Sequence, residues 1–405
     1  MPPPTLPEVQ KDAFDRILSE AVESKSTPAL FFGVTNAEGP IYMRTMGTKL
    51  VDDPTSEPID EDTVFWLCSQ TKLITSIAAL QLIEQGKITL DTPVETRAAQ
   101  LQRRPPRRKI TFGQLLNHSS GLDYFVDGTT PMTGPARIMP VAYSHHYKDG
   151  EGVSKFFEIV KGSFPGVPLR FEPGNGFAYG FSTDCAGFIV ERLSGKSLEQ
   201  YFQDHIFAPL GITSASFYLT PPLKSRLLPL SYRNKSGGVE PWKGPHVVNQ
   251  DLAAHVAGRV HLGGVGLHMS QKDYLTILRH LLQIKGGTVT NRILSRASVD
   301  SMFAPTLPPV GAAIFNEFIG LMMGPTLGLP AGDAQFGRGL FVTTEDVPGK
   351  RRKGSGAWAG WAATSFFLDP TTGVAAVFAT QIAPTGDETH EQLYALLERE
   401  LYAGL

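Results

Sequence analysis

Ser69 and Lys72 are the residues whose types and spacing most directly suggest chemistry. They form the only Ser-x-x-Lys sequence in the chain, and they begin the apolar segment LITSIAALQLIEQGK, which is typical of a buried helix closed by Gly86. A serine oxygen near a helix N-terminus is close to the positive end of the helix dipole, which stabilises a developing alkoxide. Lys72, three residues later, lies one turn along the same helix face, so its amine can reach the hydroxyl.

This pair predicts nucleophilic catalysis, in which Ser69 attacks and the Lys72 amine accepts its proton. Apolar Trp66, Leu67 and Ile74 surround the pair in the sequence, and a poorly solvated amine favours the neutral form that a general base needs. A motif of two fixed residues also arises by chance about once in a chain of this length. The alternative is an N-cap serine followed by a solvated lysine, and the motif alone does not separate the two.

Tyr179 is the third candidate, in the segment FEPGNGFAYGFSTDCAGFIVERLSG. A Pro-Gly turn precedes the tyrosine and a helical pattern follows it, which places Tyr179 on a loop before a helix. Beside a lysine ammonium its phenol can carry the proton between Ser69 and a leaving group. A single tyrosine, taken alone, is more often a packing residue whose hydroxyl has a partner.

The elements that must position these residues divide the chain into strand-rich ends and a helix-rich middle. A hairpin is predicted in the segment ALFFGVTNAEGPIYMRTMG, a loop rich in Asp and Pro after it up to Asp62, and strands in FGRGLFVTTEDV, GAWAGWAATSFFLDP and GVAAVFATQI. Helices are expected at 8–25, 111–117, 153–161, 183–194, 197–206, 271–285 and 388–405.

The economical assembly of these elements is an α/β (α+β) fold. One antiparallel sheet is built from both chain ends and flanked by the terminal helices, and a large, mostly helical lobe is inserted. We expect a single catalytic domain over 1–405, with a sheet lobe at about 8–65 and 335–405 and a helical lobe at about 66–334. The site is expected at the seam between the two lobes.

Four segments carry a resemblance to a known family. In chain order they are VFWLCSQTKLITSIAALQLIEQGKITLDTPV, ITFGQLLNHSSGL, FEPGNGFAYG and IFAPLGITSASF. They resemble the signature of the serine β-lactamase and penicillin-binding-protein superfamily, nearest to its class C-like branch with the family VIII carboxylesterases. The APLGIT and RRKGS stretches are also similar to acyltransferases of the lovastatin pathway. The resemblance, over about 60–380, implies a β-lactamase/transpeptidase-like fold, with Ser69 as nucleophile, Lys72 as its activating partner and Tyr179 as a shared acid/base.

The family's Lys-Thr-Gly element is absent from this chain. By position it should be Trp358-Ala359-Gly360, followed by Trp361. The resemblance implies that this strand borders the substrate, and that the backbone N–H groups of Ser69 and Trp361 form an oxyanion hole that survives the side-chain change. The lost cation argues against β-lactamase activity, because an indole offers apolar area instead, and it favours neutral, bulky, hydrophobic acyl or alcohol groups. A second departure is Phe181, where β-lactamases have an asparagine.

Composition limits the partners and the compartment. Hydrophobic residues are 41% and charged residues 19% of the chain, with a net charge of −2, so neither nucleic acid nor a charged membrane surface is expected as a partner. The sequence shows neither the pattern of an N-terminal signal peptide nor an apolar run long enough to span a membrane. Its two cysteines could form one disulfide, but so few thiols are typical of a protein from a reducing compartment. We therefore expect a cytoplasmic protein. A Gly-x-Ser-x-Gly elbow is absent, which excludes an α/β-hydrolase site.

Other conspicuous residues are interpreted as structural. The basic run from Arg103 to Lys109 is either a solvated surface loop, which we favour, or a dock for an acidic acyl-carrier protein or phosphopantetheine. No metal or cofactor is expected, because the histidines lack the spacing and neighbouring ligands of a metal site. His118, in the family-like NHSSGL loop, is expected to be a hydrogen-bonded scaffold. The histidines considered as ligands are His145, His146, His255 and His261.

Three functional hypotheses follow. The first is a serine acyltransferase that takes an acyl group from a thioester or ester donor and passes it to an alcohol of a natural-product, polyketide-like acceptor. The second is a carboxylesterase that uses the same residues, with water as acceptor. The third is a non-catalytic binding module, which the intact Ser69, Lys72 and Tyr179 argue against.

Overall fold

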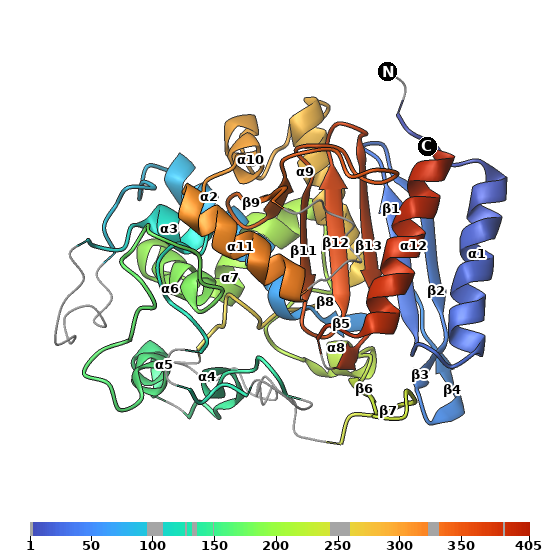
Figure 1. Cartoon of the computed structure of the whole chain (residues 1–405), viewed down its shortest axis with the longest axis horizontal. Helices are drawn as coiled ribbons and strands as arrows, with labels where there is room; N and C mark the ends of the chain where they lie inside the picture. The colour runs from blue at the N-terminus through green and yellow to red at the C-terminus, as the bar shows by residue number, and fades with distance from the viewer. Residues whose placement is uncertain are drawn as a thin grey trace.

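The main sheet of the protein joins the two ends of the chain. The computed structural model describes residues 3–94, 108–125, 128–131, 136–148, 150–243, 260–322, 332–383 and 385–405 (Figure 1). Within them, a seven-stranded sheet runs in the order β2-β1-β13-β12-β11-β10-β9, and every neighbouring pair is antiparallel. Its strands are β1 (Leu30–Thr35), β2 (Pro40–Met46), β9 (Ala334–Phe336), β10 (Phe341–Thr343), β11 (Gly356–Gly360), β12 (Thr364–Asp369) and β13 (Val374–Ala379).

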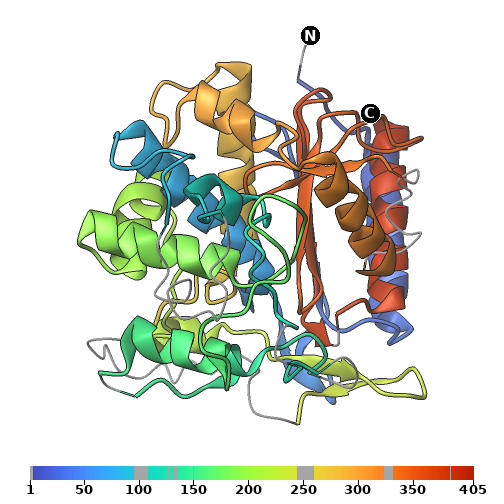
Figure 2. The same cartoon turned by 60° about the vertical axis from the view of Figure 1, so that its left-hand side comes forward.

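The helices fall into two groups, one flanking the sheet and one forming the helical part of the molecule. Figure 2 shows the sheet nearly edge-on between them. The described helices are α1 (Glu8–Glu23), α2 (Thr71–Glu84), α3 (Phe112–Leu116), α4 (Val141–Ser144), α5 (Gly152–Lys161), α6 (Ser182–Ser194), α7 (Leu198–Phe202), α8 (Pro221–Ser225), α9 (Gln271–Gly286), α10 (Arg296–Met302), α11 (Pro309–Met322) and α12 (Glu388–Gly404).

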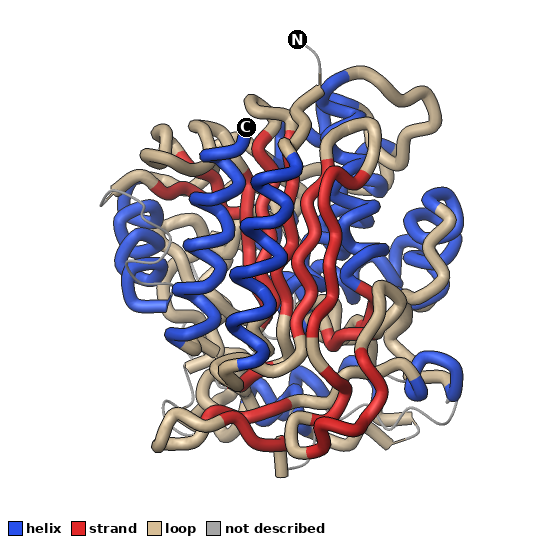
Figure 3. The backbone as a smooth tube through the Cα atoms, turned by 90° about the vertical axis from the view of Figure 1, so that its right-hand side faces the viewer, coloured by secondary structure: helices blue, strands red, loops and turns tan. Residues whose placement is uncertain are grey.

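Each face of the sheet is covered by a different set of helices. The terminal helices α1 and α12 lie side by side on one face, as Figure 3 shows. Phe32 of β1 packs there against Phe14, with ring centroids 5.1 Å apart, and Phe378 of β13 stacks on His390. The opposite face meets α9, where the ring of Phe366 lies 5.2 Å from that of Tyr274. Successive side chains of a strand point to opposite faces, so these fully buried strands require apolar residues at nearly every position.

This architecture confirms the predicted fold class. The antiparallel sheet is built from both chain ends, the terminal helices flank it, and helices dominate the segment between. The predicted helices at 111–117, 153–161, 183–194 and 271–285 correspond to α3, α5, α6 and α9, and the helix at 197–206 is α7, which continues as a π-helical turn (Gln203–Phe207). The division into one domain with two lobes at the stated boundaries stays a prediction.

The structure corrects the predicted loop after the first hairpin. Residues there form a second hairpin of β3 (Thr48–Leu50) and β4 (Asp53–Pro58). The sequence DPTSEP has low strand propensity, and most of β4 is exposed, so no apolar alternation announces it. The remaining short elements are β5 (Val64–Trp66), β6 (Ser231–Arg233), β7 (Val239–Pro241), β8 (His268–Ser270), β14 (Ile382–Ala383), the 3-10 turn η1 (Cys68–Gln70) and the 3-10 turn η4 (Ala208–Leu210).

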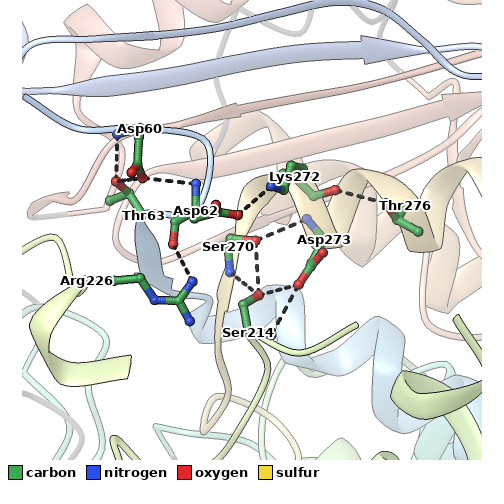
Figure 4. A network of polar contacts seen from close by, with 9 residues as sticks. All are labelled: Asp60, Asp62, Thr63, Ser214, Arg226, Ser270, Lys272, Asp273 and Thr276. Carbon is green, nitrogen blue, oxygen red and sulfur yellow. Dashed lines mark hydrogen bonds and ion pairs between the residues drawn. The ribbon is translucent and has the colours of Figure 1, made fainter. Parts of the chain in front are cut away.

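A polar network fixes the strand that leads to Ser69. Strand β5 pairs antiparallel with β8, which runs directly into α9. Figure 4 shows how side chains at both ends hold this corner: Ser270 caps α9 by accepting from the Asp273 N–H, and Ser214 donates to the Asp273 carboxylate over 2.6 Å. Lys272 pairs with Asp62, just before β5. The segment that carries Ser69 is therefore anchored on a rigid framework.

None of the helices in the described ranges is both long and apolar enough to cross a membrane.

Candidate active site

Ser69 lies on a tight turn between β5 and α2. Strand β5 ends at Trp66, Cys68 takes a left-handed φ of 46°, and Ser69 sits in the 3-10 turn η1, immediately before α2. Every residue of α2 from Thr71 to Leu82 is buried, so the helix is enclosed on all sides, and its N-terminus is fixed under the serine. The prediction placed Ser69 in the first helical turn; the structure places it in the turn that leads into the helix.

Ser69, Lys72 and Tyr179 meet within hydrogen-bond distance. The Lys72 Nζ is 3.0 Å from the Ser69 Oγ, and the Tyr179 hydroxyl donates to the same oxygen over 2.8 Å. The Lys72 Nζ also lies 4.7 Å from the centre of the Tyr179 ring. Lys72 is 2% and Ser69 7% exposed, so the group is shielded from bulk water. Tyr179 stands on a loop just before α6, as expected. The catalytic roles of the three residues stay a prediction.

Strand β11 closes the other side of this group. The Trp358 indole Nε1 donates to the Tyr179 hydroxyl over 3.2 Å. A Cβ on Gly360 would come within 2.4 Å of the Leu67 carbonyl oxygen and 2.3 Å of the Thr364 Oγ1, so only glycine lets β11 approach the turn before Ser69. This close approach brings the strand against the nucleophile turn.

The oxyanion hole expected from the backbone N–H groups of Ser69 and Trp361 stays a prediction. Burial raises the pKa of the Cys68 thiol, and the Lys72 charge and the backbone N–H groups of Trp361 and Ser69 oppose that rise. Cys68 and Cys185 are buried free thiols, so no disulfide joins them. The cytoplasmic location, which was argued partly from these cysteines, stays a prediction.

A pocket opens above Ser69 with about 610 Å³ of space not filled by atoms. Its wall is mostly apolar, and the residues with a side-chain hydroxyl that line it are Ser69, Tyr124, Tyr143, Tyr179 and Thr385. No Lys, Arg, Asp or Glu occurs among the described residues that line it. Such a wall suits a neutral, hydrophobic ligand. The apolar lining residues include Ile138, Met139, Val265, Phe318, Trp358 and Trp361.

Four residues that the sequence analysis did not single out complete the polar side of the site. The Lys72 Nζ donates to the Gly264 carbonyl oxygen over 2.9 Å and to the Tyr124 hydroxyl over 3.4 Å. Tyr124 contacts Tyr143, which donates to the fully buried carboxylate of Asp184. Tyr124 follows the family-like NHSSGL loop, and Asp184 is an acidic residue in a predicted buried helix. Each position therefore gave a weak sequence indication of a functional residue.

Two of the four histidines considered as metal ligands, His145 and His261, have carboxylate partners. His145 pairs with Glu151 at 3.0 Å, and His261 lies 2.7 Å from both Glu191 and the Tyr218 hydroxyl. His255 lies outside the described residues. The ring of His118 is buried against Tyr179, at 5.0 Å between centroids, and its backbone oxygen accepts from the Ala178 N–H. Its ring Nδ1 has no hydrogen-bond partner among the described residues, so only the backbone of His118 meets the expected role of a hydrogen-bonded scaffold. Burial lowers the pKa of His118 well below its usual range.

The basic run is only partly visible. Residues 103–107 lie outside the described part of the chain. Of the rest, the Arg108 guanidinium donates to the Asn175 side-chain oxygen over 3.3 Å, and its backbone N–H reaches the Glu172 carboxylate at 3.4 Å. Whether the run docks a partner stays open, and the solvated loop stays the favoured prediction.

Known proteins resemble this chain over nearly its whole length. It is 29% identical to the lovastatin esterase of Penicillium rubens, with 96% of this chain and 97% of that protein aligned. It is also 29% identical to the monacolin J acid methylbutanoyltransferase of Aspergillus terreus, over 95% of this chain and 94% of that one. Among solved structures, a mutant of the simvastatin synthase of Aspergillus terreus matches with a TM-score of 0.78 and 28% identity, covering 97% of this chain and 95% of that chain.

The family model described as beta-lactamase matches residues 14–400. That range includes the serine turn, the tyrosine loop and the β11 strand whose geometry is described above. The resemblance first suggested by four sequence segments thus extends over the whole fold. The chain belongs to the β-lactamase family.

Proposed function

We propose that this protein is a serine acyltransferase, which forms an acyl-enzyme on Ser69 and passes the acyl group to an alcohol of a polyketide-like acceptor. The observation that carries the proposal is the Ser69 Oγ, which has the Lys72 Nζ at 3.0 Å and the Tyr179 hydroxyl at 2.8 Å on the floor of an apolar pocket. A nucleophile with a base and an acid in hydrogen-bond reach is what covalent acyl transfer requires.

The first half-reaction transfers the acyl group to the enzyme. The Ser69 oxygen attacks the carbonyl carbon of a thioester or ester while its proton passes to Lys72. The backbone N–H groups of Ser69 and Trp361 stabilise the negative oxygen of the tetrahedral intermediate. When the intermediate collapses, the bond to the leaving group breaks, and the Lys72–Tyr179 pair returns a proton to the departing thiol or alcohol. The product of this step is an ester on Ser69.

The second half-reaction repeats these roles with the acceptor. The incoming hydroxyl loses its proton to the same pair, its oxygen attacks the acyl carbon, and Ser69 leaves with the proton restored. The aromatic pocket wall supports a large apolar acceptor. The names of two relatives, a methylbutanoyltransferase acting on monacolin J acid and a simvastatin synthase, support an acyl acceptor of that kind here.

A carboxylesterase is the second candidate, and one comparison favours it. The lovastatin esterase aligns with 96% of this chain, at the same 29% identity as the methylbutanoyltransferase. The same residues hydrolyse an ester when water replaces the alcohol in the second half-reaction. Transferase and esterase therefore differ in how the acyl-enzyme is consumed, not in how it forms.

One experiment tests both candidates. The protein is incubated with a short acyl thioester, and the adduct is detected by intact-protein mass spectrometry and located on Ser69 by peptide mapping. We expect the adduct to decay slowly in buffer and rapidly with a hydrophobic alcohol, with the ester as product. Fast decay in buffer that added alcohols do not change would support the esterase. Absence of any adduct on Ser69 would refute both.

The acyl donor can be tested with the basic run. If an acyl-carrier protein docks there, charge reversal at Arg103, Arg104, Arg107 and Arg108 should slow transfer from the carrier and leave a free thioester unaffected. We expect no difference between the two donors, because the solvated loop is the favoured interpretation. A selective loss with the carrier-bound donor would establish the dock.

A further inference from the structure

A chain of buried hydroxyls connects Lys72 to a carboxylate on α6. The Lys72 Nζ is 3.4 Å from the Tyr124 hydroxyl, that hydroxyl is 2.8 Å from the Tyr143 hydroxyl, and Tyr143 donates to the Asp184 Oδ2 over 2.7 Å. The Asp184 Oδ1 accepts from the Gly264 N–H over 2.8 Å. All four side chains are at most 4% exposed. A buried polar chain of this kind is costly unless every member is satisfied.

The carboxylate fixes the direction of every hydrogen bond in this chain. Both oxygens of Asp184 act as acceptors, so the single O–H group of Tyr143 donates to Asp184. Its oxygen must then accept from Tyr124, which in turn can only accept from Lys72. Burial raises the pKa of both Tyr124 and Tyr143 well above the usual value, so both remain protonated donors. Burial also raises the pKa of Asp184, against the opposing effects of the Lys72 charge, the Tyr143 hydroxyl and the Gly264 N–H.

This direction has a consequence for the lysine. A neutral amine has two N–H groups and one lone pair. With the chain oriented away from Lys72, one N–H is taken by the Tyr124 oxygen and the other by the Gly264 carbonyl oxygen, at 2.9 Å. The remaining neighbour of the nitrogen is the Ser69 Oγ, at 3.0 Å. The ammonium form of Lys72 donates to this oxygen, whereas in the neutral amine the lone pair is the group left to face it, so that it can accept the Ser69 proton.

We propose that Asp184, Tyr143 and Tyr124 are positioning residues, whose one-way hydrogen-bond chain directs the lone pair of Lys72 toward Ser69. The proposal rests on the role of Lys72 as the base that activates Ser69. Asp184 acts at a distance, through two tyrosines on one side and through the Gly264 peptide on the other. The Gly264 N–H donates to Asp184, and the Gly264 carbonyl oxygen accepts from Lys72. Gly264 therefore also connects the carboxylate to the amine.

Asp184→Asn should reverse the chain rather than cut it. The Gly264 N–H is a donor, so the amide oxygen of the asparagine must face it, and the amide NH₂ must face Tyr143. Tyr143 then accepts from the amide and donates to Tyr124, and Tyr124 donates to the Lys72 nitrogen. The lone pair is consumed, and the base is blocked without any change in shape.

The pH profile of acylation gives a readout that a structural role would not move. The groups that face Lys72 from the packed elements are Cys68, His118, Tyr124, Tyr179 and Asp184. Asp184 is the one among them whose negative charge favours the ammonium form. Removing it should move the acid limb of the profile to lower pH while the plateau falls. A partly unfolded variant would lower the plateau without moving the limb.

Asp369→Asn is a matched control on the other side of the molecule. Asp369 is likewise fully buried, and it accepts from the Tyr402 hydroxyl over 2.7 Å and from the Arg352 N–H over 3.0 Å. It stands at the end of β12, and no contact connects it to Ser69 or Lys72 within the described residues. Thr371 and Thr372 donate to it as well. The exchange removes the same kind of buried charge beside a tyrosine hydroxyl, so it measures the general cost of such a change.

The experiment measures acyl-adduct formation in single turnovers for the wild type, Asp184→Asn, Tyr143→Phe, the double variant and Asp369→Asn. We expect a loss of about 10²-fold for Asp184→Asn, a smaller loss for Tyr143→Phe, and a near-wild-type rate for Asp369→Asn. In the double variant, Asp184→Asn should add little, because Tyr143 no longer transmits the reversal. Rate losses that multiply in the double variant, or equal rate losses for Asp184→Asn and Asp369→Asn, would overturn the proposal. Absence of an adduct in the wild type would instead refute the proposed function.

Discussion

The two walls of the pocket differ in the kind of contact that they make. We define the α2 wall by Ser69, Lys72 and Tyr124, and the β11 wall by Trp358, Gly360 and Trp361. In the α2 wall the Lys72 amine has three polar neighbours within 3.4 Å. In the β11 wall the side chains are two indoles and no charge, and each indole N–H has a partner, the Tyr179 hydroxyl for Trp358 and the Arg137 carbonyl oxygen for Trp361.

This difference separates two tasks that every acyl-transfer enzyme must perform. The groups of the α2 wall are buried and connected, which suits the proton transfers proposed for them. The side chains of the β11 wall suit an apolar ligand, and its proposed contribution to the oxyanion hole is a backbone N–H group, which does not depend on side chains. A change of side chains on the β11 wall can therefore alter the substrate class and leave the backbone N–H groups in place, although Trp358 also contacts the Tyr179 hydroxyl. The absent Lys-Thr-Gly element is a change of this kind.

The largest effects should come from the proton network itself. Lys72→Ala and Tyr179→Phe should each lower the rate of acyl-adduct formation by about 10²–10⁴-fold, because both act on the Ser69 proton. The double variant should be little slower than either single variant, since residues that act as one unit are strongly non-additive. Single-turnover mass spectrometry measures all three rates.

The control for this pair is Ser69→Ala, which removes only a hydroxyl and should abolish the adduct while the circular dichroism spectrum stays that of the wild type. An adduct at the wild-type rate in Ser69→Ala would show that another residue is the nucleophile. Losses that multiply in the double variant would show that Lys72 and Tyr179 act independently.

The substrate preference tests the β11 wall next. We expect clear turnover of short p-nitrophenyl esters and a kcat/KM for penicillins and cephalosporins at least about 10²-fold lower, because no described pocket residue offers a cation to the β-lactam carboxylate. Steady-state kinetics on both substrate classes measure the ratio. Comparable efficiencies would show that the wall does not set the substrate class as argued.

A finer test separates the indole ring of Trp358 from its N–H group. Trp358→Phe keeps apolar area against the pocket and removes the donor to the Tyr179 hydroxyl, at 3.2 Å. Loss of one hydrogen bond of about 1–1.5 kcal/mol predicts an acylation rate about tenfold lower, with KM for hydrophobic esters changed less. An unchanged rate with a raised KM would mean that Trp358 serves binding alone and that the two walls are not coupled through Tyr179.

The sequence predicted the two walls unequally well. The Ser69–Lys72 pair was visible as a spacing of three residues at a helix start, although that motif alone did not separate a catalytic pair from an N-cap serine and a solvated lysine. The sheet follows from apolar strands at both chain ends. Tyr179 needed the family resemblance, because a loop tyrosine has no periodic pattern. Tyr124 and Asp184 reach Lys72 only through tertiary packing of separate segments, which no spacing encodes.

The β3–β4 hairpin was missed for a different reason, since an exposed strand has no apolar alternation. The approach of β11 to the serine turn depends on Gly360, whose role becomes visible only when the Leu67 carbonyl is placed beside it. Close approaches of this kind are properties of the assembled fold.

The smallest expected effect on activity comes from His390, which lies outside both walls. Its ring stacks on Phe378, on the face of the sheet that α12 covers, whereas Trp358 pairs with Phe366 on the other face. Burial lowers the pKa of His390 from 6.5 to about 4, with Asp387 opposing and Arg233 assisting the shift. The folded protein therefore keeps this imidazole neutral over a pH range in which the unfolded chain binds a proton.

That difference makes stability, not catalysis, depend on His390. The unfolded state takes up the proton below pH 6.5, so the free energy of unfolding should fall as the pH drops from 6.5 toward 4, by at most about 3 kcal/mol from this group. Urea unfolding at pH 7 and pH 5 should show a smaller pH dependence for His390→Gln than for the wild type, while the exposed His146→Gln should behave as the wild type. Both variants should acylate at the wild-type rate at pH 7. If His390→Gln had wild-type stability but acylated more slowly, the chemistry would depend on the face of the sheet that α12 covers. The two walls alone would then not account for the activity.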